Sequence, residues 1–322
     1  MPTSAKWFQM TDNMQVRIRS IGCYLPDRRE SNYEKAERVG FDREFLENKL
    51  GVVSRSVKEP NETTSDLGIR AFEALRENSN LPVDEIQLLV VVTQHPDFKV
   101  PHMAALIHNR LGLGKHCMTF DISQGCAGYC YAVTIVTAVM DAAKLDHGVL
   151  ITSDPYSDKV DEDDKDVSLL FGDAATATHF ARDRAGYRLL DSSFGTLPDS
   201  YRCLFFDGRL QMDGGAVFKH AVQEVPPNIE ALLQRNNLAK DDVDLFLLHQ
   251  GSKYLVEYIS RWMRVPAEKA PYEAAEYGNT VSSSIPLMLQ KHVAKPVLET
   301  IVLSGFGVGF SWGSNILKRI GT

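Results

Sequence analysis

The stretch Ser123-Gln124-Gly125-Cys126-Ala127-Gly128 decides how the rest of the chain is interpreted. It follows the short apolar run Cys117–Ile122, which predicts a buried strand, and it opens the apolar segment Ala127–Lys144, which predicts a buried helix. Cys126 is therefore expected on a strand-to-helix turn, where the flanking glycines allow a tight bend. A thiol at the positive end of a helix is expected to ionise more readily, as a nucleophile requires. Free cysteines commonly only pack in a core, so partners elsewhere in the chain must decide its role.

Composition and charge indicate a globular protein and argue against nucleic acid and membrane partners. The 322 residues are 44% hydrophobic and 24% charged, which is ordinary for a globular protein with one or two cores. A net charge of −7 without a Lys/Arg cluster argues against nucleic acid as a partner. The chain shows no signal-peptide pattern and no apolar run of membrane-spanning length, so we expect a cytoplasmic protein without a membrane partner. Its five cysteines lack a framework spacing and are expected to be reduced.

The helix and strand patterns occur twice in the same order. In the first copy the helix Leu67–Asn78 leads to the strand Ile86–Thr93, and in the second the helix Ile229–Asn236 leads to the strand Val243–Leu248. Each copy continues through an amphipathic helix, a Gly-bearing turn that opens an apolar helix, and a further strand. This repetition predicts two pseudo-symmetric α/β halves packed together, with a site at their junction.

The connecting segments carry weaker patterns. Residues 1–14 are polar and predict a loose lead-in, residues 154–166 predict an acidic loop, and residues 191–215 predict an irregular connection with a hairpin. Since no low-complexity linker separates the halves, we expect one intimate unit. We divide it into an N-terminal half, residues 1–182, and a C-terminal half, residues 183–322.

Two polar residues of the second half are candidate partners of Cys126. His249 ends the strand pattern of residues 244–248, and the carboxyl ends of buried strands are where α/β sheets bind ligands. Asn279 follows Gly278 at the turn that duplicates the turn of the cysteine. Taken alone, His249 fits a hydrogen-bonded core histidine better than a functional residue, and Asn279 fits the cap of a helix. The pseudo-symmetry would bring both beside Cys126.

A Cys, a His and an Asn together fit one kind of chemistry. The thiolate accepts an acyl group from a thioester, while the imidazole and the carboxamide donate hydrogen bonds to a carbonyl oxygen that becomes an enolate when carbon dioxide is lost. The glycine-rich stretch Ser304–Phe310 would supply backbone N–H groups for an oxyanion beside the cysteine. It does not fit a phosphate-binding loop, because no helix with a P-loop lysine follows.

With these residues in place, the sequence resembles the β-ketoacyl-acyl carrier protein synthase III family of the thiolase superfamily. The motifs that carry the resemblance are spread over nearly all of the chain after the lead-in: Ile21-Gly22-Cys23-Tyr24-Leu25-Pro26, Pro60-Asn61-Glu62-Thr63, Cys126-Ala127-Gly128, Phe171-Gly172-Asp173, His249-Gln250, Gly278-Asn279-Thr280 and Gly305 to Gly313.

The resemblance implies a thiolase-like five-layer αβαβα fold, a homodimer and a decarboxylative Claisen condensation. An acyl primer bound to Cys126 would be condensed with malonyl carried on acyl carrier protein, and His249 and Asn279 would drive the decarboxylation. Acyl-CoA or acyl carrier protein would be the partners, with no cofactor and no metal.

The resemblance also implies finer roles. The backbone N–H groups of Cys126 and Val308 would form the oxyanion hole for the acyl group. Phe218 would line the pantetheine tunnel, and Lys219 would help to dock the carrier protein.

This sequence departs from the family pattern around the donor pocket. Ser252 stands where the family usually has an Asn that contacts pantetheine, and Tyr254 stands in place of an Arg. Lys49 and Phe45 align with the nucleotide-contacting Arg and Trp, and Lys165 aligns with another Arg. Losing planar guanidinium groups weakens phosphate recognition. We therefore expect a specialised condensing enzyme with an unusual acyl donor, in fatty acid or secondary metabolite biosynthesis.

Two other functions remain open at this point. An acyltransferase on the same fold would move the acyl group from Cys126 to a hydroxyl or an amine without forming a carbon–carbon bond. The second is a partner subunit of a heterodimeric synthase without catalytic activity of its own. The presence of Cys126, His249 and Asn279 argues against it, because such a subunit would not need an activated thiol and its partners. A metal site at Cys117, Cys126 and Cys130 lacks zinc-like spacing.

Overall fold

A computed structural model of the chain describes residues 15–165, 167–183, 185–293 and 298–320, so the predicted lead-in lies outside it. The strands are β1 (Gln15–Tyr24), β2 (Arg29–Ser31), β3 (Ser54–Ser56), β4 (Leu88–Val92), β5 (Met118–Ile122), β6 (His147–Ser153), β7 (Ala175–Asp183), β8 (Gly186–Thr196), β9 (Leu204–Asp207), β10 (Arg209–Met212), β11 (Leu245–Leu248), β12 (Thr300–Gly307) and β13 (Ser311–Ile320). The α-helices are α2 (Tyr33–Arg38), α3 (Arg43–Phe45), α4 (Thr64–Glu77), α5 (Met103–Leu111), α6 (Gly128–Ala143), α7 (Gly214–Arg235), α8 (Lys253–Met263) and α9 (Ser284–Val293).

The main sheet consists of two blocks of strands that repeat one topology. Its order is β11-β12-β13-β8-β1-β7-β6-β4-β5, and β1 meets β8 through the single pair Ile18 and Tyr187. In the first block β7 runs antiparallel to β1 and β6, and β4 runs parallel to β6. In the second block β13 runs antiparallel to β8 and β12, and β11 runs parallel to β12. The predicted duplication is therefore present in the sheet.

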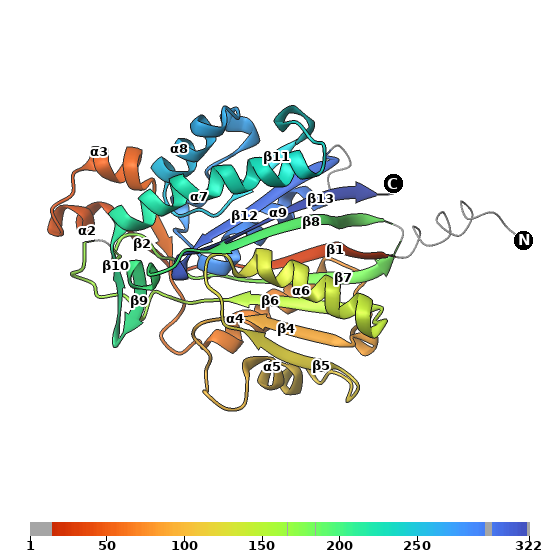
Figure 1. Cartoon of the computed structure of the whole chain (residues 1–322). Coiled ribbons are helices and arrows are strands. Elements are labelled where there is room, and N and C mark those ends of the chain that lie inside the picture. Colours follow the sequence, from red (N-terminus) through yellow and green to blue (C-terminus); the bar gives the residue numbers. More distant parts are fainter. Residues whose placement is uncertain (1–14, 166, 184, 294–297, 321–322) are drawn as a thin grey trace, which may run out of the picture.

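The helices complete the five layers that the resemblance implied. The central pair, α6 and α9, contacts strands of both blocks. The helices α4 and α5 pack on the outer side of the first block, and α7 on that of the second, where α8 packs against α7. In Figure 1 α7 and α8 lie at the end of the molecule that holds β11 and β12, and α5 lies at the opposite end. The order of layers is thus αβαβα.

Local sequence explains the main elements. β4 is the continuous apolar run Leu-Leu-Val-Val-Val, and it is fully buried because β5 and β6 flank it and helices cover it. α4 begins at a capping box in which Thr63 and Asp66 bond to each other's backbone N–H groups. α6 is buried along seven of its residues, as its apolar composition predicts.

Two expectations about these elements were wrong. The strand expected to be buried before Cys126 is β5, which lies at the edge of the sheet and leaves Met118 48% exposed, because only β4 pairs with it in the described chain. Residues 191–215 are more regular than expected, since β8 continues to Thr196 and α7 begins at Gly214. The predicted hairpin is β9 and β10.

The division at residues 182 and 183 stays a prediction; it falls at the end of β7, shortly before β8. Among the described residues, every helix is too short or too polar to cross a lipid bilayer.

Candidate active site

Both halves of the chain contribute to one cavity of about 200 Å³. The side chains of Cys126, His249 and Asn279 all line it, although they lie on three different connections of the fold. Its walls are mostly apolar and include Phe171 and Phe306. The sequence-based expectation that these three side chains share one chamber is therefore met by the geometry.

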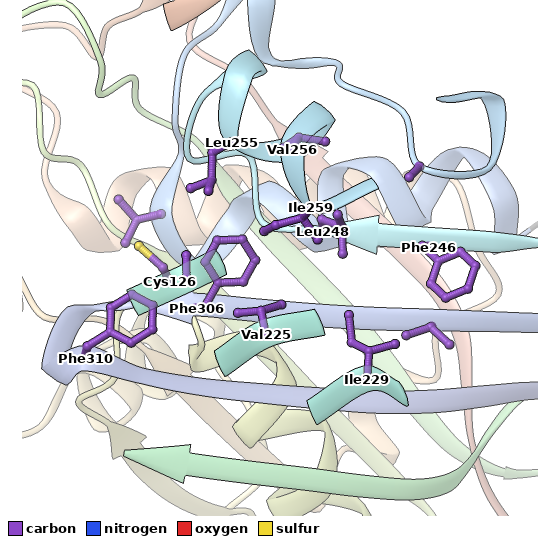
Figure 2. Packing of buried hydrophobic residues seen from close by; sticks show 14 of the residues in the cluster. Cys126, Val225, Ile229, Phe246, Leu248, Leu255, Val256, Ile259, Phe306 and Phe310 are labelled. Carbon is purple, nitrogen blue, oxygen red and sulfur yellow. The ribbon is translucent and has the colours of Figure 1, made fainter. Parts of the chain in front are cut away.

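Cys126 lies in the turn that joins β5 to α6, directly before the helix cap Ala127. The turn is closed by the Gly128 N–H, which donates to the Gly125 carbonyl over 2.7 Å. The Cys126 side chain is 3% exposed, and Figure 2 shows its sulfur beside Phe306 and Phe310. A Cβ on Gly307 would lie 2.9 Å from the sulfur, so only glycine allows the end of β12 to approach the thiol this closely.

Burial keeps Cys126 protonated. Burial, and after it the nearby Asp154 carboxylate, raise the pKa of the thiol to about 12. The backbone N–H groups of Val308 and of Cys126 itself hydrogen-bond to the sulfur and lower the pKa, but by less. The prediction of a thiolate was therefore wrong for the free protein, because loss of water outweighs the helix terminus. The same two N–H groups are those expected in the oxyanion hole.

His249 directly follows β11, and its backbone N–H donates to the Ser304 carbonyl over 2.8 Å. Burial lowers the pKa of the imidazole to about 3, so the ring is neutral at physiological pH. Its Nδ1 lies 2.8 Å from the Ser284 hydroxyl oxygen. That hydroxyl donates to the Val281 carbonyl over 3.1 Å, and the same carbonyl also accepts the Ser284 backbone N–H. A ring proton on Nε2, which the proposed role needs, requires this hydroxyl to turn its hydrogen from the Val281 carbonyl to Nδ1.

Asn279 is held by backbone contacts to the first half. Its N–H donates to the Leu170 carbonyl over 2.9 Å, and its own carbonyl accepts the Gly172 N–H over 3.0 Å. The side-chain oxygen accepts the Val281 N–H over 2.9 Å, which leaves the amide hydrogens for the cavity. Val281 has φ +52°, an uncommon conformation for a β-branched residue, and strain of this kind concentrates at functional sites.

Three of the other predicted residues line the same cavity. Phe218, Ser252 and Lys165 all line it, whereas Lys219 is exposed on α7 and does not. The Phe218 ring stacks on Tyr254 with centroids 5.5 Å apart. This part of the lining is therefore aromatic with Lys165 beside it, and the roles predicted for these residues stay predictions.

Several residues of the site were missed by sequence reasoning. Ser284 and Val281, which orient the imidazole and the carboxamide, belong to a serine-rich start of α9 whose only signal was the run Ser282-Ser283-Ser284. Asp154 looked like part of a solvated acidic loop, yet it is fully buried and accepts hydrogen bonds from Gln94 and Ser282. Among the described residues, no three His, Cys, Asp or Glu side chains are grouped to hold a metal ion.

Family models match two parts of the chain. Residues 120–198 match the model described as 3-oxoacyl-[acyl-carrier-protein] synthase III, and residues 233–319 match the model of the C-terminal part of that protein. These segments contain Cys126, His249 and Asn279.

Individual relatives are similar to this chain over nearly its full length. A β-ketoacyl-[acyl-carrier-protein] synthase III of Acholeplasma laidlawii is 31% identical, with 95% of this chain and 99% of that protein covered. A crystal structure of 3-oxoacyl-(acyl-carrier-protein) synthase III superposes with a TM-score of 0.89 at 27% identity, covering 94% of this chain and 99% of that one. The priming β-ketosynthase of the R1128 polyketide pathway superposes with a TM-score of 0.87 at 26% identity, covering 96% and 97%. The thiolase-like fold and the shared sequence place this chain in the β-ketoacyl-acyl carrier protein synthase III family.

Proposed function

We propose that the protein condenses an acyl group bound to Cys126 with a malonyl thioester of acyl carrier protein, with loss of carbon dioxide. The observation that carries the proposal is that Cys126, His249 and Asn279 line one buried cavity. A nucleophile alone would serve any acyl transfer. Two neutral hydrogen-bond donors in an apolar chamber are suited to hold an enolate oxygen.

In the acylation step the sulfur of Cys126 attacks the carbonyl carbon of the donor thioester. The new bond joins sulfur and acyl carbon, the bond to the donor sulfur breaks, and the thiol proton leaves with the donor thiol. The backbone N–H groups of Cys126 and Val308 hold the transient oxyanion. Both groups lie beside the sulfur, at the place where the oxyanion would form.

In the second step the malonyl group loses carbon dioxide and its carbonyl becomes an enolate. The N–H of His249 Nε2 and the amide hydrogens of Asn279 stabilise the enolate oxygen. The enolate carbon attacks the acyl carbonyl, a carbon–carbon bond forms, and the bond to Cys126 breaks. The thiolate then takes one proton from solvent, which restores the starting enzyme.

Two variants separate the steps. With Cys126→Ala, intact-protein mass spectrometry is expected to show no acyl adduct after exposure to acyl thioesters. With Asn279→Ala the adduct is expected to form, while carbon dioxide release from malonyl-acyl carrier protein falls by about 100-fold or more. Cys130→Ala is the matched control, because Cys130 is equally buried one helical turn away and should keep both activities.

The outcomes discriminate between functions. An adduct that survives Cys126→Ala would remove Cys126 as the nucleophile. Turnover of the wild-type adduct onto a hydroxyl or an amine without release of carbon dioxide would replace condensation by simple acyl transfer.

We further propose that acyl carrier protein docks beside Lys219 and that its pantetheine arm enters past Phe218 and Ser252. The exposed Lys219 directly follows Phe218, which lines the cavity, and a lysine there suits an acidic partner. Lys219→Glu is expected to raise KM for malonyl-acyl carrier protein and to leave acylation by a small acyl-CoA unchanged. Equal effects on both substrates would contradict this role.

A homodimer through the edge of β5 is also proposed. This edge has no partner strand among the described residues, Met118 on it is 48% exposed, and Phe98 (57%) and Val100 (84%) are exposed in the segment before α5. Light scattering should give twice the chain mass of 36.0 kDa. A monomer at micromolar concentration would contradict the proposal.

A further inference from the structure

A chain of side-chain hydrogen bonds links the turn that holds Cys126 to the loop that follows β12. The Gln124 side-chain amide, in the turn, donates to the Ser311 hydroxyl over 3.1 Å. The Ser311 hydroxyl in turn donates to the Val308 carbonyl over 2.6 Å. Because Gln124 follows β5 and Ser311 begins β13, this connection crosses the junction of the two halves. Neither side chain lines the cavity of the three proposed catalytic residues, so neither would touch the substrate.

Val308 is the residue that this connection holds. Its backbone N–H hydrogen-bonds to the Cys126 sulfur and is one of the two N–H groups expected in the oxyanion hole. Val308 lies between Gly307, at φ +156°, and Gly309, at φ +122°. Because glycine adopts a wide range of backbone angles, these neighbours do not by themselves fix the direction of the Val308 N–H.

The Val308 carbonyl is anchored twice, since the Ser311 backbone N–H donates to it as well as the Ser311 hydroxyl. Ser311 is 3% exposed and pairs with Gly307 of β12 on one side and with Thr196 of β8 on the other. On its other side the loop packs against the cysteine turn, because a Cβ on Gly125 would lie 3.0 Å from Val308 Cγ2. The loop is therefore held between the sheet and the turn.

From this geometry we infer that Gln124 and Ser311 are positioning residues of the oxyanion hole, which fix the Val308 N–H beside the sulfur of Cys126. The inference rests on the proposed acylation of Cys126. The Gln124 amide occupies an acceptor site of the Ser311 oxygen, which leaves the hydroxyl hydrogen directed at the Val308 carbonyl. Without either side chain the loop between the two glycines turns more freely. Because an oxyanion donor acts only when it is held in place beforehand, acylation should then slow.

The test compares Gln124→Met, Ser311→Ala and Ser311→Thr with wild type, each as the full chain. Acetyl-, butyryl- and octanoyl-CoA are offered to wild type, and the donor that labels Cys126 fastest is used throughout. In Gln124→Met and Ser311→Ala we expect the maximal rate of acylation to fall about tenfold or more, with KM for the donor unchanged. The infrared C=O stretch of the acyl adduct should move to higher frequency, because a displaced N–H polarises the carbonyl less. Ser311→Thr keeps the hydroxyl and should keep the wild-type values.

Alkylation of the free protein by iodoacetamide needs no acyl donor and gives a second measurement. The Val308 N–H lowers the pKa of the Cys126 thiol, so its displacement should raise this pKa and leave less thiolate. At a fixed pH, alkylation of Cys126 in Gln124→Met should therefore be roughly threefold slower, as followed by peptide mass spectrometry.

Asn315→Ala is the matched control, because this buried amide also joins β13 to hydroxyl groups, those of Thr134 and Ser192, but away from the loop. It should lose stability without changing the C=O frequency or the rate of alkylation. Wild-type frequency and rates in Gln124→Met, or equal changes in the control, would overturn the inference. If no donor labels wild-type Cys126, the proposed function fails, and the alkylation rates alone then decide whether the two residues hold the N–H at the sulfur.

Discussion

At the scale of single residues, burial decides the charge of the site. Cys126 remains a thiol and His249 a neutral imidazole because both side chains are removed from water and neither has a charged partner of opposite sign among the causes of its pKa shift. A neutral pair fits the proposed roles, since the sulfur attacks while hydrogen-bonded to two N–H groups and the imidazole donates without carrying a charge.

The first prediction concerns Ser284 as a positioning residue. In Ser284→Ala the imidazole loses the partner of Nδ1, so the proton is no longer fixed on Nε2 and decarboxylation should slow by about tenfold or more. Nitrogen NMR shifts of His249 should show a mixture of tautomers. Ser283→Ala is the control, because that neighbouring hydroxyl is equally buried and bonds to Thr152 instead. Unchanged shifts and an unchanged rate of decarboxylation would contradict the role.

The second prediction concerns Asp154 and pH. Burial raises the pKa of this carboxyl from 3.8 to about 6, so between those values the folded state binds more protons than the unfolded state. Stability from this group is therefore present in acid and is lost as pH rises through about 6, by on the order of 3 kcal/mol. Asp154→Asn should remove that loss.

The measurement for Asp154 is urea unfolding of wild type and Asp154→Asn at pH 4.5 and 7.5. The stability of the variant relative to wild type should increase with pH. The variant should also alkylate faster at Cys126, because removing the carboxylate lowers the thiol pKa. A constant difference between the two proteins at both pH values would contradict this account.

At the scale of elements, α7 shows how tertiary packing overrides a local signal. The helix runs through Pro226 and Pro227, although proline removes an N–H donor and normally ends a helix. The buried residues Ala221, Val225 and Ile229 lie on both sides of the prolines and share one core, which keeps the helix continuous.

The third prediction is that Pro227→Ala stabilises the protein. Pro227 is exposed, and alanine restores an N–H donor to the Gln223 carbonyl, so the free energy of unfolding should rise by about 2 kcal/mol. Thermal or urea unfolding measures this. Pro60→Ala, in an exposed turn, is the control and should not stabilise. A lower melting temperature for Pro227→Ala would show that the ring itself is needed.

At the scale of the whole molecule, the site exists because the backbones of the two halves are in direct contact beside Cys126. β12 of the second half passes the Cys126 turn so closely that a Cβ on Gly305 would lie 2.6 Å from the Cys126 carbonyl oxygen and 2.8 Å from the Ala127 Cα. These are backbone atoms of a helix start and cannot move without shifting α6.

The fourth prediction follows from this contact. Gly305→Ala should destabilise the fold by about 1–3 kcal/mol, because the added methyl overpacks the junction, and it should reduce acylation of Cys126. Gly114→Ala is the control, since a Cβ there meets nothing within 4 Å. Wild-type stability and acylation in Gly305→Ala would mean that the halves can separate slightly at this point.

Local and repeated sequence patterns were enough to predict much of the fold. The apolar run of β4, the cap before α4, the turn at Cys126 and the doubled order of elements all follow from residues close in sequence. The three proposed catalytic residues could be named for the same reason, because each follows a strand or opens a helix. The regular path of residues 191–215 was not predictable, since pairing of β8 with β13 depends on residues more than 100 positions away.

The sequence by itself therefore determined the kinds of element, their duplication and the identity of Cys126, His249 and Asn279, because these depend on local periodicity and motif spacing. Only the tertiary structure decided that Cys126 is a protonated thiol and that Ser284 and Val281 orient its two partners. Burial, hydrogen-bond geometry and the shape of a cavity arise where distant segments meet, and no window of sequence contains them.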